Sequence, residues 1–89
     1  MQQEKLLTVN NHFQLQWEKR QDCFVLLYPE GMVQLSQSAG EIMNLCDGVR
    51  TIDEIVKELE NKFQTTGLYD DINDFLIEAK EKKWILENE

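Results

Sequence analysis

The chain has 89 residues and a formal net charge of -8, with 17 acidic residues against 9 basic ones. That length accommodates one small domain, and an apolar share of 42% is too high for a disordered chain. The acidic balance disfavours a nucleic-acid partner, because proteins that grip phosphates cluster Lys and Arg, and the longest apolar run, residues 23–28, is too short to span a bilayer. With no signal peptide visible, we expect a cytoplasmic protein.

The first half of the chain has the periodicity of β-strands. In residues 13–18 every second side chain is apolar, as in a strand with one buried face. A polar turn leads to the continuous apolar run at 23–28, and Pro29-Glu30-Gly31 then reverses the chain. A third short strand over residues 32–35 follows, so the sequence predicts an antiparallel meander of three strands.

The second half predicts three helices. Ser36 or Ser38 caps the first, and Asp47-Gly48 ends it, because glycine supplies the left-handed conformation that follows many helices. Thr51-Ile52-Asp53-Glu54 is a capping box that opens the second helix. The third begins at Asp70 or Asp71, with an acidic start and a basic end that suit the helix dipole.

This order predicts an α+β fold, a three-stranded antiparallel sheet followed by three helices that cover one face of it. Three short helices in tandem, the last two in a helix-turn-helix relation, make the expected fold winged-helix-like. Residues 84–86 are expected to turn back onto the core. We expect a single domain over residues 6–86, with flexible termini at 1–5 and 87–89.

The groups that catalysis needs are sparse. His12 is the single histidine and is expected to be solvated, which removes most acid–base schemes. Cys23 and Cys46 lack metal-ligand spacing and are expected to be reduced core residues. The glycines are scattered, so no phosphate-binding loop is present. We therefore expect a protein that is not an enzyme and needs neither metal nor cofactor.

The third strand is the candidate binding element. At the edge of a sheet, its unpaired backbone groups accept another strand, and no Lys or Pro in residues 32–35 blocks that edge. The alternative is that Val33 and Leu35 simply fill the core, and the residue pattern leaves both readings open. On the third helix, Ile77 lies off the apolar stripe; we interpret it as a lone exposed residue rather than the lining of a groove.

Residues 26–43, followed by Cys46-Asp47-Gly48, resemble the PqqD family, small chaperones of pyrroloquinoline quinone biosynthesis. Shorter matches occur at Leu15-Gln16-Trp17, at residues 51–55 and at Lys83-Trp84-Ile85. The resemblance runs from about Leu6 to Leu86. The Leu-Leu-Tyr-Pro-Glu-Gly segment together with Cys-Asp-Gly is its specific part.

The resemblance implies a winged-helix-like recognition element for ribosomally synthesised peptides. Such a domain binds the leader of a PqqA-like precursor as a strand added beside the third strand, in the cleft next to the third helix. It then presents the peptide to a PqqE-like radical S-adenosylmethionine enzyme, which crosslinks a Glu and a Tyr within it. Carried onto this chain, the expected peptide contacts are Met32, Val33, Gln34 and Leu35 on the strand, and Ile72, Phe75, Ala79 and Lys82 on the helix.

Within that set, Lys82 is expected to meet an acidic residue of the peptide. Trp17, Tyr28 and Trp84 are expected in the core. The main alternative function is a winged-helix DNA-binding regulator, whose recognition helix would offer only Lys80, Lys82 and Lys83 among many acidic residues. An enzyme subunit of the same pathway is a third hypothesis.

Overall fold

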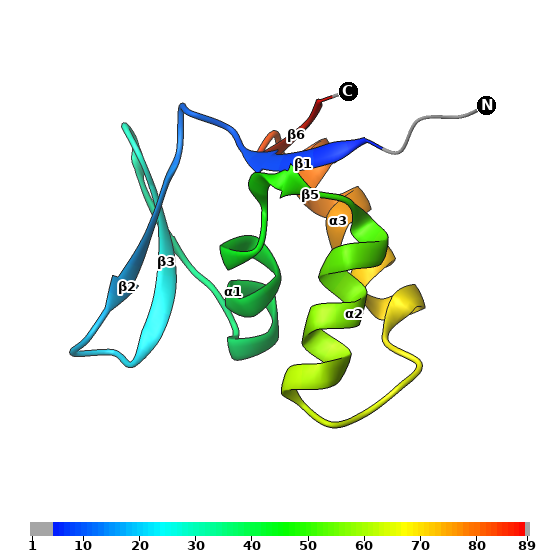
Figure 1. Ribbon diagram of the computed structural model, residues 1–89. Coiled ribbons are helices and arrows are strands. Elements are labelled where there is room, and N and C mark those ends of the chain that lie inside the picture. Colours follow the sequence, from blue (N-terminus) through cyan, green and yellow to red (C-terminus); the bar gives the residue numbers. More distant parts are fainter. Residues whose placement is uncertain (1–4, 89) are drawn as a thin grey trace.

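A computed structural model describes residues 5–88 (Figure 1). Six strands and three helices occur in this part of the chain, and the strands form two separate antiparallel sheets of three. The elements are β1 (Leu6–Val9), β2 (Gln14–Glu18), β3 (Cys23–Tyr28), β4 (Gly31–Gln34), α1 (Gln37–Asn44), β5 (Asp47–Arg50), α2 (Ile52–Lys62), α3 (Tyr69–Glu81) and β6 (Ile85–Asn88).

The sheet with strand order β2-β3-β4 is the predicted meander. Leu15 faces Leu26 and Trp17 faces Phe24 across β2 and β3, so the alternating apolar positions share one face. The third strand of this sheet begins and ends one residue earlier than predicted: β4 begins at Gly31, and Leu35 follows its end. The α+β class, with antiparallel strands and three helices, is confirmed.

A second sheet, of order β5-β1-β6, was not expected and corrects the prediction of a single sheet. Its strands come from three distant parts of the chain, so no local pattern announces their pairing. Leu6 pairs with Asn88 and Leu7 with Glu87. Glu87 and Asn88 are therefore part of β6, contrary to the expectation of a flexible end; residues 1–4 and 89 lie outside the described residues.

Gly48 does not end the first helix, as the sequence predicted. The first helix ends at Asn44 with Leu45 as its C-cap, and Gly48 lies inside β5 with a φ of 87°. At this point the register of β1 and β5 shifts between Leu7 and Thr8. The glycine therefore supplies the left-handed backbone of an irregularity in the sheet rather than the end of a helix.

The helices begin close to where their capping residues predict. Ser36 Oγ accepts from the Ala39 amide at the start of α1, and Thr51 and Glu54 form the predicted capping box of α2. In contrast, α3 begins at Tyr69 after Leu68, with no side-chain cap. The Leu68 amide instead donates to Glu60 Oε2 at 3.0 Å, which ties the start of α3 to α2.

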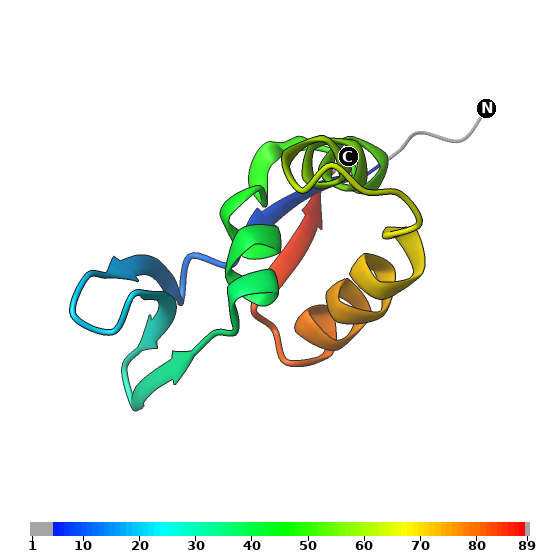
Figure 2. The ribbon, with the colours of Figure 1, turned by 90° about the horizontal axis from the view of Figure 1, so that it is seen from below.

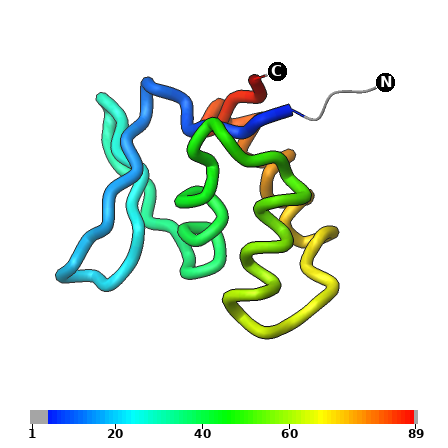
Figure 3. Tube along the Cα trace, viewed as in Figure 1, coloured from blue at the N-terminus to red at the C-terminus, as the bar shows by residue number. Residues whose placement is uncertain are grey.

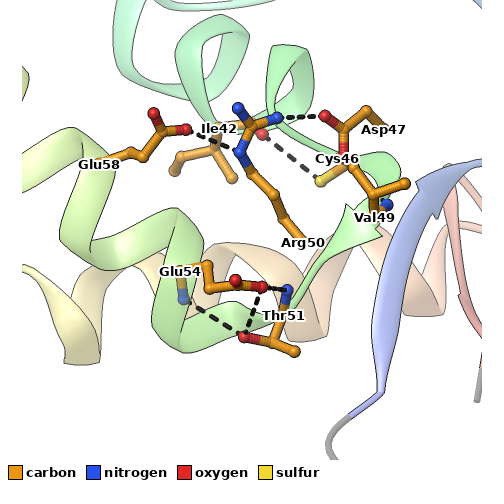
Figure 4. Close-up of polar contacts among 8 residues, drawn as sticks. All are labelled: Ile42, Cys46, Asp47, Val49, Arg50, Thr51, Glu54 and Glu58. Carbon is orange, nitrogen blue, oxygen red and sulfur yellow. Dashed lines mark hydrogen bonds and ion pairs between the residues drawn. The ribbon is translucent and has the colours of Figure 1, made fainter.

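An arginine on β5 connects the small sheet to α2. Arg50 Nε lies 2.7 Å from Glu58 Oε2, and its Nη1 is paired with Asp47 Oδ2 (Figure 4). In the same view, Cys46 Sγ donates to the Ile42 carbonyl at 3.4 Å. The Arg50–Glu58 ion pair joins β5 to the middle of α2, and the Cys46 contact joins the residue before β5 to the last turn of α1.

The core lies between the three helices and one side of each sheet. Leu26, Met43, Ile55, Leu76 and Ile85 are its largest fully buried members. Figure 3 traces how the chain leaves the β5-β1-β6 sheet after β1, runs through the β2-β3-β4 sheet and returns to α1. Within residues 5–88, no helix has the length and apolar character needed to cross a membrane.

Candidate functional site

β4 forms one edge of its sheet, and its hydrogen-bond pattern shows which backbone groups point outward. The Leu35 amide donates to the Phe24 carbonyl at 3.0 Å, so this pair is hydrogen-bonded. In an antiparallel ladder such pairs alternate with pairs that exchange no hydrogen bond. Val33 opposite Leu26 and Gly31 opposite Tyr28 therefore bond to β3. The backbone groups of Met32 and Gln34 point away from β3, to the side where no other strand of the described residues is paired.

The side chains of β4 alternate between the two faces of the sheet. Val33 lies on the same face as Leu26, toward the core, and is partly buried. Met32, 48% exposed, and Gln34 lie on the other face. Leu35 is 6% exposed and belongs to the core. The core-filling reading of Leu35 is thus confirmed, while the edge of β4 stays accessible beside it.

An apolar groove of about 360 Å³ begins where β4 ends. Ser36 and Ser38 lie at its near end, between β4 and α1, and apolar side chains from all three helices form its walls. Figure 2 shows β4 and α3 on either side of α1. The residues around the groove are Ser36, Ser38, Ala39, Ile42, Leu59, Phe63, Leu68, Asp71, Ile72 and Phe75.

The four peptide contacts predicted on and just after α3 lie in three different environments. Ile72 and Phe75 line the groove, Phe75 with its ring 6.4 Å from that of Trp84. Ala79 is fully enclosed and is not among the residues that line the groove, which corrects its expected role as a peptide contact. Lys82 follows α3 and is exposed, with its Nζ 3.0 Å from Glu78 and 5.0 Å from the centre of the Trp84 ring.

Two aromatic residues are exposed at the surface, and one of them, Trp17, was expected in the core. Trp17 is 50% exposed and packs edge-on against Phe24 with ring centres 5.1 Å apart, so it is a surface residue rather than a core one. Phe63 continues the apolar stripe of α2, yet it is 43% exposed at the groove. Its place at the C-cap, where the helix turns away from the core, was the signal in the sequence. Tyr28 and Trp84 are partly buried.

The potentially reactive side chains do not converge. His12 is exposed after β1, and within residues 5–88 no group of three His, Cys, Asp or Glu side chains has the arrangement of a metal site. Burial, with a smaller effect from the charge of Asp47, raises the pKa of the Cys46 thiol to about 12. Such a thiol is a poor nucleophile at neutral pH, because the thiolate is the reactive form.

The charges on α3 do not suit the alternative of a DNA-binding helix. Lys80 Nζ lies 3.1 Å from Glu87, and Lys82 is paired with Glu78. The exposed side of α3 carries Asp70, Asp71, Asp74, Glu78 and Glu81. A helix that enters a DNA groove needs an excess of cations, so this surface repels a phosphate backbone.

Fold and site together define a small α+β domain of winged-helix type, with an exposed strand edge that adjoins an apolar groove. The sequence model of Coenzyme PQQ synthesis protein D (PqqD) matches residues 23–85, and the chain belongs to this family. A "PqqA binding protein" of Rahnella aquatilis is 43% identical over 90% of this chain and 94% of its own length. Proteins of the same description from Methylococcus capsulatus and Pseudomonas paraeruginosa are 38% and 50% identical, over 98% and 82% of this chain and 94% and 80% of their own lengths.

Two solved structures share the fold. The solution structure of the PqqD part of Methylobacterium extorquens PqqCD, described as a stand-alone recognition element for ribosomally synthesised and post-translationally modified peptides, has a TM-score of 0.75 over 90% of this chain and 87% of that chain. The heterocyclase TruD has a TM-score of 0.71 over 93% of this chain and 11% of that chain. Both are 22% identical to this sequence. They confirm the α+β architecture of antiparallel strands and three helices.

Proposed function

We propose that this protein binds a PqqA-like precursor peptide as a strand added along β4 and presents it to a PqqE-like radical S-adenosylmethionine enzyme. Membership of the PqqD family and the description of several relatives as PqqA binding proteins support the choice of peptide. The observation that carries the proposal is the outward direction of the Met32 and Gln34 backbone groups beside an apolar groove.

A guest strand at this edge gains both affinity and specificity. Its backbone bonds to the N–H and C=O groups of Met32 and Gln34, which need no particular guest sequence. Because strand side chains alternate, every second guest residue faces the same side as Val33 and the groove, where Phe75 and Phe63 offer apolar surface. The remaining guest side chains lie on the side of Met32. The proposed peptide therefore has apolar residues two positions apart.

The role proposed is one of binding and presentation, with the chemistry left to the partner enzyme. The single histidine is exposed and is not among the residues that line the groove, and the Cys46 thiol is buried against α1. For the peptide-contact set we retain Met32, Val33, Gln34, Ile72, Phe75 and Lys82, and add Phe63 and Ala39. Lys82, next to Trp84, is placed to pair with a guest carboxylate if it releases Glu78.

Backbone-directed substitution tests this mode of binding. Gln34→Pro removes an amide that points away from β3, and proline is tolerated on an edge strand when its missing N–H would have faced solvent. Gln34→Ala removes the same side chain and keeps the amide. We expect the proline variant to keep its unfolding temperature within a few degrees, yet to bind the precursor peptide about tenfold more weakly or worse, since one hydrogen bond and the local strand geometry are lost.

Isothermal titration measures the affinities, and amide chemical-shift mapping locates the peptide. Shifts concentrated at residues 31–35, the start of α1 and the Phe75 side of α3 are expected. Equal affinities for the Gln34→Pro and Gln34→Ala variants contradict strand addition at β4. Shifts confined to β2 or to the β5-β1-β6 sheet do so as well.

A further inference from the structure

The apolar groove beside β4 has a single charged residue in its lining. Of the described residues that border it, Asp71 alone carries a charge, and the only other polar ones are Ser36 and Ser38. Asp71 lies in the first turn of α3, and its residue is exposed. The apolar contacts proposed for the guest peptide give this carboxylate no role.

The basic side chains nearest to this wall of the groove are already paired with acidic ones. Lys62, at the end of α2, lies 2.7 Å from Glu41 of α1, and Lys82 lies 3.0 Å from Glu78. None of the ion pairs found within residues 5–88 includes Asp71. A cation brought by the guest therefore finds the Asp71 carboxylate free of a competing ion pair in this part of the chain.

The surroundings of Asp71 on α3 are negative as well. Asp70 and Asp74 are exposed on the same helix, whose first basic residue is Lys80. An aspartate in a first helical turn also stabilises the helix through its dipole. Asp70 fills that role equally, yet only Asp71 borders the groove. The two neighbours thus separate an effect on the helix from an effect on the guest.

The spacing along α3 matches that of an extended guest. Asp71 and Phe75 are four residues apart, so they lie on the same side of the helix, about 6 Å apart along its axis. Side chains on one face of a strand repeat every two residues, about 6.6–6.8 Å. For a guest that runs along α3, an apolar side chain against Phe75 therefore places the next side chain of the same face beside Asp71.

We infer that the groove selects a precursor peptide in which a Lys or Arg lies two positions from an apolar residue, the charge pairing with Asp71 and the apolar side chain entering the groove. The inference deepens the proposed function, on which it rests, by naming the residue that distinguishes one guest sequence from another. The aliphatic stem of the basic residue packs on the apolar wall at Leu68 while its head reaches the carboxylate.

Asp71 is proposed as a specificity residue more than as a source of affinity. An exposed ion pair contributes little to binding, because water and salt screen it. A guest with Asp or Glu at the same position is repelled, however, and must also desolvate two like charges. The backbone bonds to β4 accept any sequence, so this carboxylate supplies a discrimination that the strand edge lacks.

The test on the protein compares Asp71→Asn with Asp70→Asn. Both variants remove one charge from the same helical turn and keep the size of the side chain, and only the first changes the groove. Calorimetric titration with the PqqA-like precursor peptide is expected to show about fivefold weaker binding for Asp71→Asn at low salt and less than twofold for Asp70→Asn. The difference should shrink at high salt.

The test on the peptide replaces each of its Lys and Arg residues by glutamine in turn. One replacement is expected to weaken binding to the parent protein about fivefold and binding to Asp71→Asn less than twofold, because the paired charge is already gone. The inference is overturned if Asp71→Asn and Asp70→Asn have equal effects. It is overturned as well if every peptide replacement weakens binding to the parent and to Asp71→Asn by the same factor.

The Gln34→Pro variant distinguishes failure of this inference from failure of strand addition. If Gln34→Pro weakens binding but no peptide charge is coupled to Asp71, strand addition at β4 stands and the inference fails. If Gln34→Pro binds as well as Gln34→Ala while the coupling to Asp71 persists, the guest uses the groove without pairing to β4, and the inference alone stands. A parent protein that does not bind the precursor peptide contradicts both.

Discussion

The side-chain amide of Asn10 donates to the carbonyl oxygen of Lys83 at 2.8 Å, joining residues 73 positions apart. Asn10 lies directly after β1, where the chain leaves one sheet for the other, and Lys83 lies between α3 and β6 with a φ of 67°. The Asn10 backbone amide donates to the Trp84 carbonyl as well, also at 2.8 Å, and its side-chain oxygen accepts from the His12 amide. Asn10 thus fixes the path of both segments.

Replacing Asn10 by alanine is expected to lower the free energy of unfolding by about 1–3 kcal/mol, because two backbone groups lose their partner at a site that is 8% exposed. Asn11→Ala is the matched control, since the neighbouring asparagine is exposed and its variant should change the free energy by less than about 0.5 kcal/mol. Urea unfolding followed by circular dichroism measures both. Equal losses from the two variants would show that the Asn10 bonds contribute little.

Gly40 sets the distance between α1 and β3. A Cβ atom at this position would lie 2.7 Å from Phe24 Cδ2 and 3.0 Å from Phe24 Cβ, so an alanine forces the helix and the strand apart. We expect Gly40→Ala to cost about 1–3 kcal/mol of stability, despite the better helix propensity of alanine. The shift of α1 should also alter the groove and weaken peptide binding.

Gly31→Ala serves as the comparison for Gly40→Ala. At Gly31 the added Cβ meets Tyr28 Oη at 3.5 Å, an ordinary van der Waals distance. Its unfolding midpoint in urea should stay close to that of the parent. If Gly40→Ala were as stable as Gly31→Ala, close packing of α1 on Phe24 would not be what requires a glycine.

Sequence patterns predicted the elements that depend on residues close together in the chain. The alternation around Leu15 identified β2, a hydroxyl cap at Ser36 or Ser38 placed the start of α1, and Thr51 placed the start of α2; the cap of α1 is Ser36. The β5-β1-β6 sheet escaped prediction for a physical reason. Asp47-Gly48 has the composition of a turn, and it is a strand here only because β1 offers it a partner nearly forty residues away.

The candidate site was predicted in part for the same reason. The edge position of the third strand follows from strand order, which a meander determines locally, whereas the outward direction of the Gln34 amide depends on the pairing with β3. Ala79 was misplaced because helical periodicity gives the rotation of α3 but not which neighbours close over it. Phe63 shows the converse, an apolar residue left at the surface where its helix ends.

Cys46 provides a pH-dependent measure of the packing of α1. Burial, with a smaller effect from Asp47, raises its pKa from 9.0 to about 12, so the folded protein keeps the thiol proton at a pH where the unfolded chain releases it. Stability from this group is complete below pH 9 and declines as the pH rises from 9 toward 12. The difference in unfolding free energy between the parent and Cys46→Ala should therefore shrink above pH 9.

Alkylation of the two cysteines tests the packing of α1 independently. At pH 8, iodoacetamide should modify Cys23, which is partly exposed, well before Cys46, which is 3% exposed. Mass spectrometry of the digested protein distinguishes the two sites. Equal rates of modification would mean that α1 opens often enough to expose Cys46, in contradiction to a firmly packed helix.

Phe63 and Ile77 form a matched pair for testing which side of α3 the peptide uses. Their side chains are 43% and 44% exposed, so alanine at either position removes a similar surface fraction and little core packing. Phe63 lines the groove that continues from β4, whereas Ile77 belongs to the opposite side of α3. We expect Phe63→Ala to weaken peptide binding about tenfold, as for an aromatic residue at the centre of an interface, and Ile77→Ala to leave it within twofold. Calorimetric titration of both variants decides the matter: a larger loss at Ile77 would move the peptide to the far side of the helix and leave the β4 groove without a ligand.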